Sequence, residues 1–265
     1  MKKALAIILL ILSLTLTACE WIPSYDDTLQ SFEEHLVLEN DLYLERIELL
    51  NQLTDDGLSG IVKIRKSSAS QLTISYGSGL IFDEDFFYYY ILTNNHIVYD
   101  TDTKTAIYQA FDYKDHMYNA TLLANSNLYD LAVLRIRKIE GVPLHVFSFA
   151  KDNPEIDTHL ITMGYPESQL NTIHMGVVEQ YGAVSIDADN QIIDVSFDVV
   201  YAAIPVKSGS SGSATINDQF ELVGIVFAGN FPQSGTIADY AFIIPITEVK
   251  AFLTLNDFDY IEVTS

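Results

Sequence analysis

Basic residues are scarce in this sequence. It has 14 Lys and Arg against 36 Asp and Glu, so its formal net charge is −22 over 265 residues. A chain with that charge repels phosphate backbones and anionic lipid head groups over a Debye length. We therefore expect no nucleic acid among its partners.

Cysteine is almost absent as well. The single cysteine, Cys19, has no partner for an internal disulfide, so the fold cannot depend on disulfide bridges. The six histidines include no pair at i, i+4 on a predicted helix, and no cluster with the spacing of metal ligands is present. We expect no metal site.

Long apolar runs are also missing, except at the N-terminus. Lys2 and Lys3 precede the run ALAIILLILSLTLTA, and Cys19 follows it. This pattern is typical of a secretory signal, being too short and wrongly flanked for a membrane span. The segment Leu16-Thr17-Ala18-Cys19 resembles the bacterial lipobox, in which the signal is cut before the cysteine and the thiol carries diacylglycerol. The alternative is an ordinary signal peptide with a coincidental cysteine.

Removing residues 1–18 takes away two lysines and no acids, which leaves the mature chain at 12 − 36 = −24. We expect an acidic protein held by a lipid at Cys19 on the extracytoplasmic face of a cell membrane. In a cell with one membrane it would face outward. In a cell with two, Glu20 carries no obvious signal for retention at the inner membrane, so the outer membrane is the alternative.

Residues 19–56 form the next predicted segment, rich in Glu and Leu. Its apolar residues have near-helical spacing, which predicts one or two amphipathic helices: Phe32, Leu36, Tyr43, Ile47 and Leu50. The segment is interpreted as a stalk, as a brace packed on the following domain, or as a short oligomerisation helix. We favour the brace.

The remaining residues, 57–265, change to short runs of β-branched and aromatic residues separated by turn residues. The clearest runs are GIVKIRK, QLTISYGSGLIF, YYYILTNNHIV, TAIYQAF, HMYNATLLA, LAVLRI, HLITMGYP, TIHMGVVEQYG, VSFDVVYAAI, SATIND and ELVGIVFAG. The 49% hydrophobic content is enough for a sizeable core. So many strands predict an all-β barrel or sandwich of about 200 residues, with a helix only at ITEVKAFLTL.

The loop PVKSGSSGSATIND, residues 205–218, carries four serines within a β region. A serine nucleophile needs a tight turn whose backbone N–H groups face the developing oxyanion. Only Ser211 has a glycine two residues before it, Gly209, and another directly after it, Gly212. Ser211 is therefore the candidate nucleophile.

A serine nucleophile also requires a histidine and a carboxylate that orients it. His96 follows the apolar run YYYILT, where a side chain can be held firmly at the end of a strand. Asp130 stands directly before the apolar run LAVLRI, and an acid near a core is costly unless it is paired. The other histidines are interpreted as packed or surface residues.

Together these blocks resemble the His, Asp and Ser blocks of trypsin-like serine proteases, and more narrowly those of the HtrA/Deg group. The blocks are YGSGLIFDEDFFYYYILTNNHIV, NLYDLAVLRI and GSSGSATINDQFELVGIVFAG. MGYPESQLNTIHMGVVEQYG and YAFIIPITEVKAFL are similar to further segments of that group. The resemblance covers roughly residues 57–256.

The resemblance implies two six-stranded antiparallel β-barrels of the chymotrypsin type, with the active site in the cleft between them, an N-terminal helical segment and a short C-terminal helix. It implies that Ser211 attacks the scissile carbonyl, that His96 transfers the proton and that Asp130 orients His96. The N–H groups of Gly209 and Ser211 would form the oxyanion hole, with Ser210 lining the turn. No cofactor is implied, and the expected partners are polypeptide substrates.

The chain departs from the family at three points. Ser213 replaces a glycine of the usual GNSGG loop, which adds strain if that residue needs a positive φ. Lys207 either points to solvent or favours an acidic substrate side chain, and we favour solvent. The sequence ends at Ser265, so we expect no C-terminal PDZ domain, and the oligomeric state stays open between monomer and trimer.

Two functions follow from these observations. The first is a lipid-anchored serine endopeptidase that hydrolyses exported or unfolded proteins through an acyl-enzyme. The second is a catalytically silent surface protein with the same fold that acts by binding, as an adhesin or a chaperone-like module. The complete triad favours the first.

Overall fold

The computed structural model describes residues 29–30, 37, 44–68, 73–100, 105–168, 172–188, 191–231 and 237–263. The chain divides into two compact units, Met1–Glu48 and Leu49–Ser265. All described residues of the first unit are helical. The predicted signal peptide and lipid site at Cys19 lie outside the described residues.

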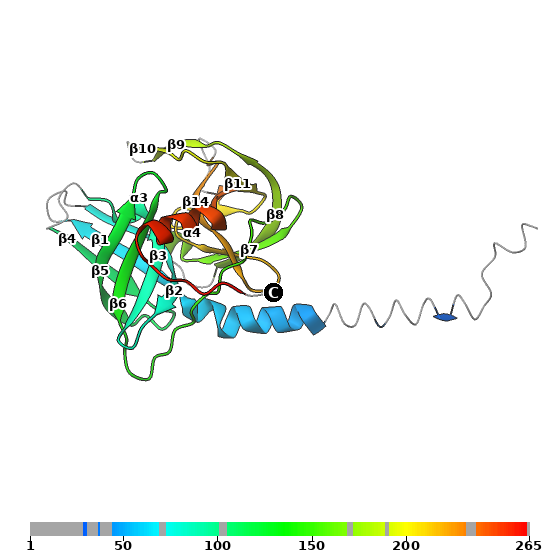
Figure 1. Cartoon of the computed structure of the whole chain (residues 1–265), viewed down its shortest axis with the longest axis horizontal. Coiled ribbons are helices and arrows are strands. Elements are labelled where there is room, and N and C mark those ends of the chain that lie inside the picture. Colours follow the sequence, from blue (N-terminus) through cyan, green and yellow to red (C-terminus); the bar gives the residue numbers. More distant parts are fainter. Residues whose placement is uncertain are drawn as a thin grey trace, which may run out of the picture. The chain divides into compact units, whose positions relative to one another are not determined.

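The first half of the second unit is a closed antiparallel barrel with strand order β1-β2-β3-β6-β5-β4 (Figure 1). A 3-10 helix, η2 (Gly57–Gly60), leads into it. Its strands and one short helix are β1 (Ile61–Ser68), β2 (Thr73–Glu84), β3 (Tyr88–Asn94), α3 (Asn95–Val98), β4 (Ala106–Phe111), β5 (Met117–Ser126) and β6 (Leu131–Arg137). These six strands are consecutive along the chain, with no strand of another sheet among the described residues between them.

The second half is another closed antiparallel barrel, with strand order β11-β16-β14-β13-β7-β8. Its strands are β7 (His159–Gly164), β8 (Thr172–Gly182), β11 (Val199–Ala202), β13 (Ala214–Ile216), β14 (Leu222–Gly229) and β16 (Ala241–Pro245). Outside it lie η3 (Pro166–Ser168), the pair β9 (Ser185–Ala188) and β10 (Gln191–Asp194), the pair β12 (Val206–Lys207) and β15 (Ile237–Ala238), and α4 (Ile246–Leu255).

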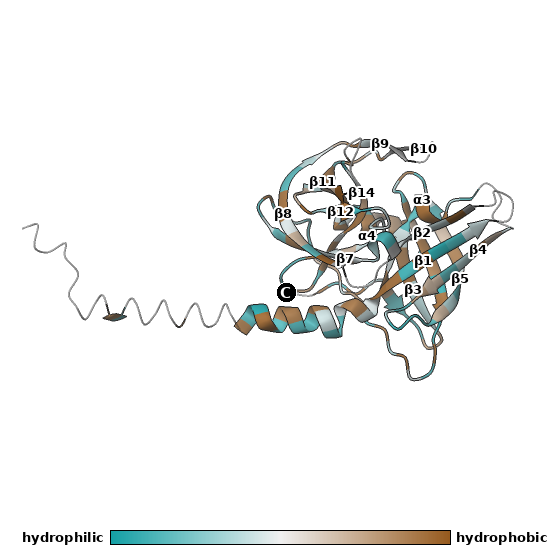
Figure 2. Ribbon diagram, turned by 180° about the vertical axis from the view of Figure 1, so that it is seen from behind, coloured by the Kyte–Doolittle hydropathy of each residue, from teal (hydrophilic) through white to brown (hydrophobic). Residues whose placement is uncertain are grey.

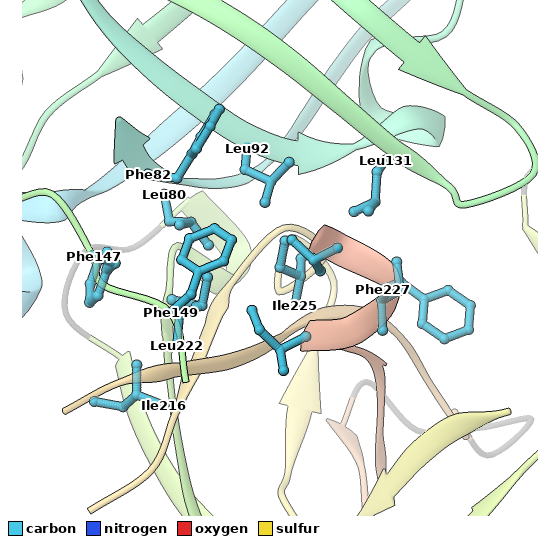
Figure 3. Packing of buried hydrophobic residues seen from close by; sticks show 14 of the residues in the cluster. Leu80, Phe82, Leu92, Leu131, Phe147, Phe149, Ile216, Leu222, Ile225 and Phe227 are labelled. Atoms are coloured by element: carbon cyan, nitrogen blue, oxygen red, sulfur yellow. The ribbon is translucent and has the colours of Figure 1, made fainter. Parts of the chain in front are cut away.

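Three hydrophobic clusters hold this unit together. One fills the first barrel and another the second. The third and largest joins them, because side chains of β2, β3 and β6 face those of β13 and β14 (Figure 3). Figure 2 shows hydrophobic and hydrophilic residues interleaved along the strands, as expected of sheets with one buried face. Burying apolar side chains of this size contributes about 1.5 to 3 kcal/mol each.

The helix before η2 covers residues 44–55. Within the second unit, Leu53 is fully buried in the cluster between the barrels and Leu49 packs against it. Leu50, by contrast, is 49% exposed. No helix among the described residues combines the length and the apolarity needed to cross a bilayer.

The predicted fold is confirmed. The described residues of this chain form two six-stranded antiparallel barrels with helical segments at both ends, and the predicted terminal helix ITEVKAFLTL has the bounds of α4.

Candidate active site

His96 lies in α3, the short helix that follows β3. The apolar strand anchors this position, because β3 pairs with β6 along its whole length and ends with Asn94 opposite Leu131. The neighbours of His96 on both sides, Asn95 and Ile97, are buried, while the imidazole keeps 20% of its surface exposed. The histidine is therefore firmly held and still reachable from solvent.

Asp130 directly precedes β6 and is bonded to α3 and β3 through several atoms. Its Oδ1 accepts the backbone N–H of His96 at 2.9 Å, and its Oδ2 lies 2.7 Å from His96 Nδ1. Its carbonyl accepts the backbone N–H of Asn95 and the side-chain amide of Asn94, both at 3.0 Å. Asp130 has φ of 49°, a left-handed conformation that Asp tolerates better than most residues. These contacts fix the carboxylate in a buried position.

The pairing determines which imidazole nitrogen carries the proton. A carboxylate only accepts hydrogen bonds, so Nδ1 of His96 is the donor toward Asp130. In the neutral ring the other nitrogen, Nε2, is then unprotonated and able to accept a proton. The arrangement is that of an oriented general base.

A second Asp–His pair occurs in the turn between β4 and β5. Asp112 accepts the backbone N–H of His116 at 3.0 Å through Oδ1, and its Oδ2 lies 2.9 Å from His116 Nδ1. Tyr118 also donates to Oδ2, at 2.9 Å. Burial raises the pKa of Asp112, but these hydrogen bonds and one from Lys114 outweigh it and hold the pKa below its ordinary value. Both residues of this pair belong to the same turn, four positions apart, so their hydrogen bonds fix the conformation of that turn.

Ser211 lies on a tight turn just before β13. The glycines on either side have the positive φ angles that such a turn requires, +89° at Gly209 and +84° at Gly212. A Cβ on Gly212 would lie 1.9 Å from the carbonyl oxygen of Ser78. Only glycine fits directly after the candidate nucleophile.

The backbone of this turn is anchored through three successive carbonyls. The oxygens of Ser208, Gly209 and Ser210 accept hydrogen bonds from Glu167 N at 2.7 Å, Ser78 Oγ at 2.8 Å and Ser213 N at 2.9 Å. In a trans peptide the N–H points opposite to the carbonyl of the preceding residue. Anchoring Ser208 therefore sets the direction of the Gly209 N–H, and anchoring Ser210 sets that of Ser211. Among the described residues neither N–H donates to a protein acceptor, so both are available to a ligand oxygen.

The Ser211 hydroxyl donates to the carbonyl oxygen of Phe227 on β14, at 3.2 Å. No hydrogen bond joins Ser211 Oγ to His96 among the described residues. Catalytic hydrogen bonds are often long or misaligned without substrate and tighten when it binds. In any reaction at this serine the hydroxyl hydrogen therefore has to leave the Phe227 carbonyl and turn toward a base.

Contacts across the two barrels bring the turn beside the end of β3. Ser78 on β2 donates its backbone N–H to the carbonyl of Ser211 at 2.7 Å. Its own carbonyl accepts the hydroxyl of Thr93, three residues before His96, at 2.7 Å. The predicted residues His96, Asp130 and Ser211 thus come from β3–α3, from the start of β6 and from the turn before β13.

Two of the departures from the family pattern, Ser213 and Lys207, lie close to Ser211 in the sequence. Ser213 is not among the residues with positive φ, so the serine introduces no left-handed strain. Lys207 bonds Glu167 at 3.1 Å, rather than pointing only to solvent as we favoured. Within the described ranges, no three His, Cys, Asp or Glu side chains gather as metal ligands would.

Sequence reasoning missed one residue of this site. Ser78 hydrogen-bonds the turn through its backbone and its side chain, yet its sequence context shows only a serine inside a strand. The only available signal was its place between two glycines, Gly77 and Gly79, which indicates close packing of the backbone.

The trypsin-like peptidase domain matches residues 77–225 of the chain, a span that contains His96, Asp130 and Ser211. Serine endoprotease DegS of Escherichia coli K12 is 29% identical over 163 residues, which cover 61% of this chain and 42% of the relative. The periplasmic serine endoprotease DegP of the same strain is 28% identical over 181 residues, covering 68% and 35%. The chain thus spans less than half the length of these relatives.

Solved structures show the same fold at lower identity. The active form of the Rv3671c protease from M. tuberculosis superposes with a TM-score of 0.62 at 21% identity, covering 77% of this chain and 83% of that one. The HtrA-type protease AlgW, solved with a tripeptide, gives a TM-score of 0.61 at 21% identity, covering 78% and 62%. With the matched domain covering more than half of its residues, the chain belongs to the trypsin-like peptidase domain family.

Proposed function

We propose that this protein is a serine-type endopeptidase in which Ser211 is the nucleophile, His96 the general base and Asp130 the residue that orients His96. The observation that carries the proposal is the pair of hydrogen bonds that His96 donates to the Asp130 carboxylate, which leaves Nε2 able to accept a proton. In this proposal the turn at Ser211 forms the oxyanion hole. The backbone N–H groups of Gly209 and Ser211 donate to the oxyanion, and Ser210 lies between them.

The reaction proceeds through an acyl-enzyme. Ser211 Oγ attacks the scissile carbonyl carbon while Nε2 of His96 takes its proton, and the carbonyl oxygen moves toward the N–H groups of Gly209 and Ser211. Collapse of the tetrahedral intermediate breaks the C–N bond, and the leaving amine receives the proton from His96. Water then repeats the sequence in place of the serine and releases the acid.

The substrates that we propose are exported or unfolded polypeptides. Support comes from the relatives, which are named as serine endoproteases, one of them periplasmic. The predicted signal and Cys19 support the proposal that the domain lies on the extracytoplasmic side, held by a lipid. We propose segment boundaries at residues 1–18 for the signal, 19–56 for the lipidated cysteine and helix, and 57–265 for the protease domain.

The proposal is tested with a fluorophosphonate probe on the fragment beginning near residue 22, beside Ser211→Ala and His96→Ala. We expect a single labelled residue, Ser211, located by mass spectrometry, and labelling that is lost in both variants. Absence of label on folded protein, with candidate peptides present, would overturn the proposal and favour the binding function.

A further inference from the structure

Ser78 is a fully buried serine at the point where β2 of the first barrel meets the nucleophile turn of the second. Its hydroxyl lies 2.8 Å from the carbonyl oxygen of Gly209, 2.8 Å from the backbone nitrogen of Tyr165 and 3.3 Å from the hydroxyl of Ser213. These three groups come from the turn, from the segment after β7 and from the residue before β13.

The direction of each of these bonds follows from what the groups can do. A hydroxyl has one donor hydrogen and two acceptor lone pairs. A carbonyl only accepts, so the hydrogen of Ser78 goes to Gly209, and an N–H only donates, so Tyr165 occupies one lone pair. The remaining lone pair accepts from Ser213. The Ser78 hydroxyl is saturated, and Ser213 must be the donor.

The bond from Ser78 to Gly209 matters because Gly209 is a glycine, the residue type with the fewest restrictions on its backbone conformation. Its φ of +89° is open to glycine but restrictive for other residues, and its carbonyl is the one in the turn that is fixed by a side chain. The carbonyls on either side are fixed by backbone N–H groups. Losing the Ser78 hydroxyl removes the bond that fixes the carbonyl of the peptide between Gly209 and Ser210. The peptide then keeps a single anchor, from the Ser210 N–H to the Lys207 carbonyl at 3.0 Å, and a rotation about it also shifts the N–H groups on either side.

Gly164 has no side chain, and this leaves the space that the hydroxyls of Ser78 and Ser213 occupy. A Cβ on Gly164 would lie 1.8 Å from Ser213 Oγ and 2.8 Å from Ser78 Oγ. Ser213 itself is buried, and its hydroxyl donates to Ser78. The space beside the turn is therefore shaped around a pair of serines and not around the glycine that is usual at residue 213.

We propose that Ser78 and Ser213 form a two-serine latch that positions the oxyanion turn of this protein, with Ser213 polarising the Ser78 hydroxyl and Ser78 holding the Gly209 carbonyl. Both are positioning residues, since neither touches the reacting atoms. The proposal rests on the proposed function of Ser211, and it makes the serine at residue 213 a functional partner of Ser78.

The test is the rate at which a fluorophosphonate labels Ser211, measured against probe concentration so that the limiting rate and the binding constant separate. Removing an oxyanion donor outright costs about 10²- to 10³-fold in rate, so releasing one from its position costs less. For Ser78→Ala we expect a limiting rate lowered about tenfold with a binding constant within about twofold of wild type. For Ser213→Ala we expect a smaller fall of about threefold.

A double-mutant cycle separates positioning from packing. Once the Ser78 hydroxyl is gone, Ser213 has nothing to polarise, so Ser213→Ala should have no further effect on the rate in the Ser78→Ala background. Ser59→Ala is the matched control, because Ser59 is also a buried serine whose hydroxyl donates to one backbone group and accepts from another, at Asp56 and His145. We expect it to leave the labelling rate unchanged.

Ser78→Ala should fold, because the backbone bonds of Ser78 to Ser211 and Thr93 remain. If it does not fold, Ser213→Ala alone decides, and a labelling rate equal to wild type overturns the latch. A wild-type rate in folded Ser78→Ala, or additive effects in the cycle, also overturns the latch and leaves the proposed function standing. Failure of the wild-type protein to label overturns both.

Discussion

Asp130 holds His96 at two points, the backbone N–H through Oδ1 and the imidazole Nδ1 through Oδ2. An aspartate that fixes both the main chain and the ring of a histidine sets its position and its tautomer together. A substitution that still accepts the backbone N–H of His96 but donates a hydrogen bond to Nδ1 isolates the contribution of the tautomer.

Asp130→Asn is that substitution. Its amide oxygen still accepts the His96 N–H, while its NH₂ group donates toward Nδ1 and moves the ring proton to Nε2. We expect peptidase activity to fall by about 10⁴-fold, with an unchanged circular dichroism spectrum. The measurement is the hydrolysis rate of a denatured protein substrate by the purified fragment.

Asp112→Asn is the control for this change, because Asp112 and His116 have the same pair of hydrogen bonds away from Ser211. We expect it to lower stability and leave the hydrolysis rate near wild type. Equal losses of activity in the two variants would mean that the effect of Asp130→Asn is structural.

Gly212→Ala should be strongly destabilising. Its Cβ would meet the Ser78 carbonyl at 1.9 Å, and the positive φ adds about 1 to 2 kcal/mol of strain for any other residue. We expect a loss of more than about 3 kcal/mol in the free energy of unfolding, measured by urea denaturation. Gly141→Ala separates the two causes, because Gly141 has φ of +76° and no atom within 4 Å of an added Cβ. It should cost about 1 to 2 kcal/mol only.

His145 makes stability depend on pH. Burial against Phe147 and Phe220 lowers the pKa of His145 from its ordinary value near 6.5, and the nearby Asp56 opposes this only in part. A histidine with a lowered pKa binds its proton more readily in the unfolded chain, so protonation favours unfolding. The free energy of unfolding should fall as pH drops below about 6.5.

Urea denaturation at pH 5, 6 and 7 measures this effect. His145→Gln cannot be protonated and should have a flatter dependence on pH. The same substitution at the exposed His159 serves as a control for replacing a histidine by glutamine. A slope unchanged in His145→Gln would assign the dependence to other groups, such as His174, whose pKa burial and Lys207 lower as well.

Cys19→Ala should release the protein from the membrane fraction. The predicted lipid is carried by that thiol, and the mature chain is too acidic to be retained on anionic lipids by charge. Membrane fractionation measures the release of the protein, and metabolic labelling with a fatty acid shows whether Cys19 carries the lipid. Membrane association that persists without label in the variant would contradict lipid anchoring at Cys19.

Much of the fold could be predicted because its signals are local. The apolar runs of β3 and β6, the glycines at residues 209 and 212 and the apolar face of α4 are each visible in short stretches of sequence. Strand pairs of two residues, such as β12 with β15, were missed because two residues show no periodicity.

The features that could not be predicted depend on contacts between segments that are distant in the sequence. Asp130 and Asp112 each orient a histidine by the same two bonds, but Asp112 holds a histidine four residues away in its own turn. Asp130 holds His96 across 34 residues, and only the pairing of β3 with β6 brings the two together. In the same way Leu50 fits the predicted helical face and is exposed, whereas Leu53 and Leu49 pack on the core.

The order of the barrels along the chain has a consequence for biogenesis. A protein that emerges N-terminus first can close its first barrel, residues 61–137, before the second exists. At that stage it carries the proposed base and its orienting acid but no nucleophile, which arrives only with residue 211. With the proposed catalytic residues, the nascent chain therefore has no complete triad until the second barrel has folded.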